Sequence, residues 1–80
     1  MLQKEIKVKM MKDLGINEHR ARAYAKMFCD KFQGNIRAIT YVLSSYTENG
    51  DIRVSYVIND KRYHLNVCGR KPYSRKENAQ

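Results

Sequence analysis

The chain of 80 residues is poor in several residue types that mark particular protein classes. It has no Trp, a single Pro and only two Cys, Cys29 and Cys68. Two cysteines are too few for a disulfide framework, so we expect free thiols in a reducing compartment, the cytoplasm. No apolar run approaches the ~20 residues that a membrane span needs, and no signal-peptide core follows Met1. We therefore expect no contact with a membrane.

Residues for catalysis or metal binding are also sparse. The cysteines and the two histidines, His19 and His64, show neither Cys-x-x-Cys nor His-x-x-x-His spacing. We find no Ser-His-acid set, Gly-rich phosphate loop or paired inward carboxylates. A chain this short buries only about 60% of the surface that its unfolded form exposes, which leaves little room for a deep cavity. We expect a non-enzymatic protein without a metal or cofactor.

Acidic residues are half as numerous as basic ones. The 8 Asp and Glu stand against 16 Lys and Arg, for a net charge of +8. Residues 1–33 carry +4, residues 34–60 carry −1 and residues 61–80 carry +5. Such a balance favours an anionic partner, either nucleic acid or an acidic protein surface. The alternative is an ordinary protein surface with many lysines.

Two helices are predicted in the first 33 residues. Leu2, Ile6, Met10 and Leu14 recur every four residues, although Ile6, Val8 and Met10 also alternate as in a strand. Gly15 can end a helix in the left-handed conformation, which favours a helix over residues 3–14. Asn17 can cap a second helix over residues 17–33. The apolar stripe of that helix is Ala21, Tyr24, Ala25, Phe28 and Phe32.

The segment LGINEHRARAY, residues 14–24, resembles the opening of the TrmB-like winged-helix regulators, where a leucine-glycine turn leads into a similar helix. The resemblance implies a local helix–turn–helix geometry. A winged helix needs two further helices, whereas strand patterns follow Gly34 here. The DNA-reading helix of that family therefore has no counterpart in this chain.

Three strands are predicted after Gly34, in IRAITYVLSSYT, IRVSYVI and RYHLNVC. Asn49-Gly50 predicts a two-residue type I′ turn, which would place Thr47 opposite Ile52. A second turn is centred on either Asn59-Asp60 or Asp60-Lys61. This register gathers apolar residues on one face of the sheet: Ile39, Tyr41, Leu43, Ile52, Val54, Tyr56, Ile58, Tyr63, Leu65 and Val67.

The predicted fold class is α+β, with the order α-α-β-β-β. A helical hairpin would pack on one face of a three-stranded antiparallel β-meander. Residues 1–69 would form the single domain, and residues 70–80 a flexible basic tail, since the tail has almost nothing apolar to bury.

The uncovered face of this sheet is the leading candidate site. Its predicted residues are Thr40, Val42, Ser44, Tyr46, Arg53, Ser55, Val57, Arg62, His64, Asn66 and Cys68. Arg53 and Arg62 could bind phosphates or base edges. Asn66, Ser55 and Ser44 could supply hydrogen bonds, and Tyr46 or His64 could stack on a base. An ordinary solvated face is the alternative. Val42 and Val57 indicate instead a dry protein contact.

Further basic candidates lie outside the sheet. The helix flank with Arg22 and Lys26 is one. The tail adds Arg70, Lys71, Arg75 and Lys76, whose phosphate contacts would carry no sequence code.

The leading hypothesis is a small protein that binds DNA or RNA, for which regulation is a compatible role. The alternative is a protein-binding inhibitor or adaptor, of the kind found in phages and mobile elements. Such a protein would dock on an acidic or nucleic-acid-binding surface of a larger protein. The sequence does not choose between DNA and RNA or determine the oligomeric state.

Overall fold

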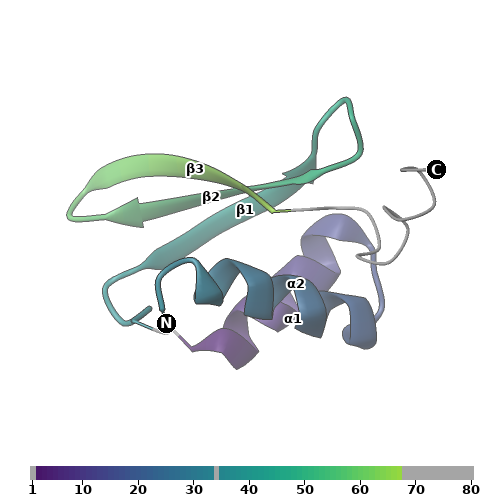
Figure 1. Ribbon diagram of the computed structural model, residues 1–80, viewed down its shortest axis with the longest axis horizontal. Coiled ribbons are helices and arrows are strands. Elements are labelled where there is room, and N and C mark those ends of the chain that lie inside the picture. The colour runs from purple at the N-terminus through teal and green to yellow at the C-terminus, as the bar shows by residue number, and fades with distance from the viewer. Residues whose placement is uncertain (1, 34, 68–80) are drawn as a thin grey trace, which may run out of the picture.

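The computed structural model describes residues 2–33 and 35–67 and confirms the predicted α+β fold. Its elements are α1 (Gln3–Leu14), α2 (Glu18–Asp30), β1 (Thr40–Tyr46), β2 (Ile52–Ile58) and β3 (Lys61–Val67). The antiparallel sheet has the strand order β1-β2-β3, and both helices lie against the same face of it (Figure 1). Within the described residues, neither helix is long and apolar enough to cross a membrane. The predicted tail, residues 70–80, lies outside the described residues.

The helix boundaries follow their capping residues. The Leu2 N–H donates to Glu5 Oε1 at 2.8 Å, and Gly15 ends α1 with a φ of 67°. Asn17 Oδ1 accepts a hydrogen bond from the Arg20 N–H at 2.9 Å and so caps α2. Helix α1 has its predicted bounds. Helix α2 is shorter than predicted and ends at Asp30, because the chain from residue 31 to residue 33 tightens into turns with i→i−3 hydrogen bonds.

The core lies between the helices and the sheet. Ile6, Met10 and Phe28 of the helices and Ile52 and Val54 of β2 have no exposed surface. The rings of Phe28, Phe32 and Tyr56 meet edge to face, with centroids 5.2 to 5.6 Å apart. The predicted α2 stripe therefore shares the helical half of the core with α1, although Phe32 at its end is only partly buried.

The loop between β1 and β2 differs from the prediction. The Gly50 N–H donates to Thr47 O at 3.0 Å, and the Thr47 N–H donates to Asp51 O at 2.8 Å. Gly50 has a φ of 87°, whereas Asn49 does not have the positive φ that a type I′ turn requires. The connection is thus a three-residue loop over residues 48–50. As a result, Tyr46 rather than Thr47 lies opposite Ile52.

A β-bulge in β1 shifts the register a second time. Tyr41 pairs with Tyr56 and Leu43 pairs with Ser55, so Val42 has no partner on β2. Both shifts run in the same direction, so before the bulge they add to two residues, and Tyr41 pairs with Tyr56 instead of Ile58. A two-residue shift restores the face, and Ile39 and Tyr41 are therefore buried as predicted. Between the bulge and the loop the shift is one residue, which reverses the face.

The predicted faces of β1 are therefore wrong between the bulge and the loop. Ser44 and Tyr46 lie on the face that the helices cover, since they pair with Val54 and Ile52. Leu43 lies on the opposite face and is 45% exposed. The strand is also shorter than predicted, because Ile36 and Ile39 form a turn that precedes it.

Strands β2 and β3 have their predicted faces. Asn59 and Asp60 have φ values of 52° and 66°, and Ile58 pairs with Lys61. These values identify a two-residue type I′ turn at Asn59-Asp60, one of the two predicted positions. Tyr63 lies on the helix side as predicted and stacks on Tyr56, but it is largely exposed at the edge of the sheet.

Asp13 joins the end of α1 to β1. Its Oδ2 accepts hydrogen bonds from the Tyr41 hydroxyl at 2.6 Å and from the Ser44 N–H at 3.1 Å. The Ser44 hydroxyl lies within hydrogen-bond distance of the same phenol oxygen. Burial and the hydrogen bond to Asp13 raise the pKa of Tyr41, so the phenol stays protonated. A second hydrogen bond joins the same two elements, because the Tyr46 hydroxyl donates to the carbonyl oxygen of Leu14, the residue after Asp13, at 3.1 Å.

We expect Asp13→Ala to destabilise the fold by about 2 kcal/mol or more, because it leaves the buried Ser44 N–H without its acceptor. The free energy of unfolding in urea measures the effect. Asp30→Ala is the matched control. It removes only an exposed ion pair with Lys26, which contributes about 0 to 1 kcal/mol. Equal losses for the two variants would show that Asp13 does not tie the two layers together.

We expect Gly50→Ala to cost about 1 to 2 kcal/mol. No atom lies within 4 Å of the added Cβ, so the cost comes from the positive φ alone. Glu48→Ala, in the same loop without a positive φ, should change the stability by less than about 0.5 kcal/mol. Thermal or urea unfolding compares them, and a tolerated Gly50→Ala would argue against the left-handed conformation of Gly50.

Candidate nucleic-acid interface

The face of the sheet turned away from the helices, here called the open face, consists of three cross-strand rungs. It is the upper surface of the sheet in Figure 1. The rungs are Ser45–Arg53–Asn66, Leu43–Ser55–His64 and Thr40–Val57–Arg62. None of these nine residues is acidic.

Arg53 and Arg62 occupy the two outer rungs of the open face. Both are exposed, and neither forms an ion pair or hydrogen bond with another described residue. They are four residue positions apart along the strand direction, or roughly 13 Å at ~3.3 Å per residue. This spacing lets each arginine reach a separate anionic group.

His64 lies in the central rung between the arginines. Its Nδ1 is 3.0 Å from the Ser55 hydroxyl, which orients the ring and leaves the other ring nitrogen for a partner. Ser55 itself is only 7% exposed. Of the predicted hydrogen-bonding residues, Asn66 is therefore accessible beside Arg53, whereas Ser55 is covered and Ser44 lies on the other face.

The open face also has an apolar strip on β1 and β2. Leu43 is 45% exposed and Val57 is partly buried, and Val42, the unpaired bulge residue next to Leu43, is 41% exposed. Leu43 was predicted to lie in the core, and its exposure on this face is the consequence of the longer loop. The Asn-Gly pair did contain the relevant signal, because Gly in a left-handed conformation also closes three-residue loops. The bulge at Val42 has no comparable signal in the sequence.

Tyr46 does not belong to the open face. It pairs with Ile52 on the helix side, and its hydroxyl is bonded to the end of α1. Arg53 therefore lies beside Ser45, and no tyrosine on the open face is available to stack on a base.

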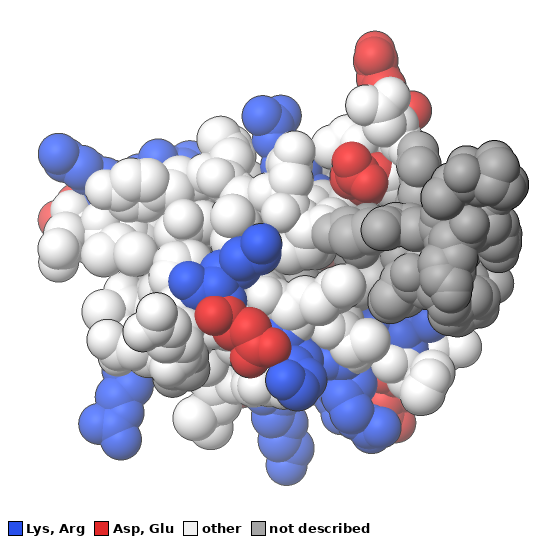
Figure 2. All heavy atoms as spheres, in the orientation of Figure 1, with Lys and Arg blue, Asp and Glu red and all other residues white. Residues whose placement is uncertain are grey.

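Arg22 and Lys26 lie on α2, so the structure does not bring them together with the open face. Arg22 Nη2 is 3.0 Å from Glu18 Oε2, and Lys26 Nζ is 3.0 Å from Asp30 Oδ2. Figure 2 shows many of the basic side chains along the helical layer, at the lower edge of the molecule, and acidic ones at the tip of the β1–β2 loop. The tail residues Arg70, Lys71, Arg75 and Lys76 lie outside the described residues.

The described chain gives no metal centre or reactive thiol. Among residues 2–33 and 35–67, no three His, Cys, Asp or Glu side chains are grouped so as to hold a metal ion. Burial raises the pKa of Cys29, which keeps this thiol protonated and poorly reactive.

No protein-family model, curated protein or solved structure matches this chain. A functional assignment therefore depends on the fold and on the open face.

Proposed function

We propose that this protein is a non-enzymatic nucleic-acid-binding protein that uses the open face of its sheet. The observation that carries the proposal is the pair Arg53 and Arg62, two exposed cations without a carboxylate on their face. Guanidinium groups bind phosphate in a bidentate manner, and binding releases counterions from the nucleic acid.

The remaining polar groups of the open face support contacts with bases. Asn66 lies beside Arg53. His64 lies on β3, in the rung between the rung of Arg53 and the rung of Arg62. An amide can bond two atoms of a base edge, and an imidazole can donate to a base or stack on it. Arg53 and Arg62 would therefore hold the backbone while Asn66 and His64 contact the bases. We place this function in the cytoplasm, where a free thiol such as Cys29 stays reduced.

A second candidate function is docking on an acidic surface of a larger protein, as an inhibitor or adaptor. The exposed strip of Val42, Leu43 and Val57 favours it. Protein interfaces commonly have an apolar centre, with arginine enriched and lysine depleted. The open face has this composition, because its two cations are both arginines.

The double variant Arg53→Ala/Arg62→Ala tests the first function. We expect it to keep its fold, since both side chains are exposed. We expect the slope of log K against log salt for nucleic-acid binding to fall by roughly two, one for each lost phosphate contact. Fluorescence anisotropy with duplex DNA, single-stranded DNA and RNA at several salt concentrations measures the slope.

Lys9→Ala/Lys12→Ala is the matched control, because it removes two exposed charges from α1 and leaves the open face intact. An equal decrease in slope for both double variants would mean that net charge, rather than the open face, governs binding. An unchanged slope for Arg53→Ala/Arg62→Ala would exclude the open face as the nucleic-acid site and leave protein docking as the function of this surface. Leu43→Ser would then be the variant that impairs docking.

A further inference from the structure

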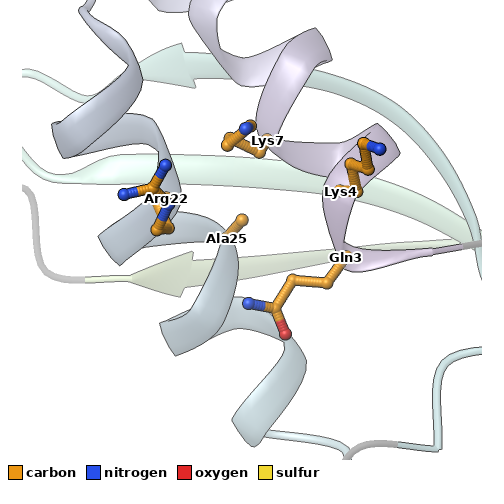
Figure 3. A pocket seen from close by; sticks show the side chains of 5 residues that line it. All are labelled: Gln3, Lys4, Lys7, Arg22 and Ala25. Carbon is orange, nitrogen blue, oxygen red and sulfur yellow. The ribbon is translucent and has the colours of Figure 1, made fainter.

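A hollow with basic walls lies between α1 and α2, on the side of the helices away from the sheet (Figure 3). Its volume is about 210 Å³, and it is lined by Gln3, Lys4, Lys7, Arg22 and Ala25. Ala25 is fully buried and lies at the base of the hollow, whereas Gln3 and Lys4 at its rim are exposed. Because a water in the liquid occupies about 30 Å³, the hollow has room for a hydrated tetrahedral anion.

The cations of the hollow outnumber the carboxylate beside them. Lys7 Nζ and Arg22 Nη2 lie 2.7 and 3.0 Å from the same oxygen, Glu18 Oε2. Lys4 forms no ion pair or hydrogen bond with another described residue. Three positive charges therefore face one negative charge.

The ion pair with Glu18 keeps Lys7 in place. The hydrogen bond from Lys7, together with the charges of Lys7 and Arg22, holds the pKa of Glu18 below its ordinary value, so Glu18 is ionised at neutral pH. The Lys7 side chain is only 16% exposed, whereas that of Arg22 is 60% exposed. Lys7 is thus fixed in the wall of the hollow, and Arg22 can turn towards an incoming anion.

We infer that this hollow binds a phosphate group, as a second anion site separate from the open face. Lys4 and Arg22 would donate to the phosphate oxygens, and the Gln3 amide would supply a further donor. The positive end of the α1 dipole, at Gln3 and Lys4, adds to the attraction. Glu18 opposes the anion, so affinity depends on the balance between it and the three cations. The inference does not rest on nucleic-acid binding at the open face.

Titration with inorganic phosphate tests the site, with the protein's amide resonances followed by NMR at constant ionic strength. We expect phosphate to shift the amides of Gln3, Lys4 and Arg22. A unit charge at about 4 Å in water changes affinity about five-fold. Lys4→Gln and Arg22→Gln should therefore each weaken binding about five-fold. Lys9→Gln, a lysine on the same helix outside the hollow, should leave the affinity unchanged.

Glu18→Gln gives the sharper result. If the hollow binds phosphate, removing the opposing carboxylate should tighten binding about five-fold. If the three charged groups serve only to hold α1 against α2, the same change should give no gain. Circular dichroism checks that each variant folds. The inference is overturned if Glu18→Gln binds phosphate no better than the parent, or if Lys9→Gln weakens binding as much as Lys4→Gln.

A backbone phosphate and a free phosphate can be told apart with two more probes. A short single-stranded oligonucleotide that shifts the same amides at much lower concentration than a mononucleotide would identify the backbone as the ligand. Equal potency would identify a small phosphate compound, and either result supports the site. If neither probe nor inorganic phosphate shifts these amides, the site does not exist. Loss of oligonucleotide binding in Arg53→Ala/Arg62→Ala with phosphate shifts retained would separate the two proposals.

Discussion

The hydrogen bonds of the Asp13 carboxylate decide how the helical layer is seated on the sheet. One carboxylate oxygen accepts from the Tyr41 hydroxyl and from the Ser44 N–H, about thirty residues along the chain. Hydrogen bonds to a charged group contribute about 1.5 to 3 kcal/mol each, and an unpartnered buried N–H costs about 1 to 3 kcal/mol. Asp13 itself is exposed and both hydrogen bonds are partly buried, so solvent reduces these values, but even about 1 to 2 kcal/mol is a sizeable part of a total stability of about 5 to 15 kcal/mol.

The same contact determines which residues of β1 face outward. Because Ser44 must turn towards Asp13, its neighbours Leu43 and Ser45 turn away from the helices. Half-exposing a leucine forgoes roughly half of the ~1.5 to 3 kcal/mol that full burial would give. The hydrogen bonds among Asp13, Tyr41 and Ser44 therefore offset the burial energy lost at Leu43. The apolar strip of the open face follows from this balance, and with it the possibility of a protein contact.

The two sides of the molecule hold their positive charge in different ways. On the helical layer, Lys7, Arg22 and Lys26 form ion pairs with Glu18 or Asp30. On the open face, Arg53 and Arg62 have no such partners among the described residues. An unpaired guanidinium has no intramolecular bond to exchange when it binds a phosphate. The hollow between the helices contains both kinds of cation, since Lys7 and Arg22 are paired with Glu18 and Lys4 has no partner among the described residues. Changing Glu18 therefore tests whether the paired cations there can also bind an anion.

Local patterns in the sequence determined α1, the start and apolar stripe of α2, and the faces of β2 and β3, and they narrowed the β2–β3 turn to two positions. Each depends on signals within a few residues, such as the four-residue apolar repeat of α1, Gly15 and the Asn17 cap. The outward side of β1 was decided only in the tertiary structure. Asn49-Gly50 suits loops of two or three residues, and the bulge at Val42 has no local signal. A one-residue shift turns every side chain of a strand to the opposite face. Local propensity leaves the two registers of β1 nearly equal in free energy. The observed register is the one in which the Ser44 N–H donates to Asp13, about thirty residues earlier in the chain.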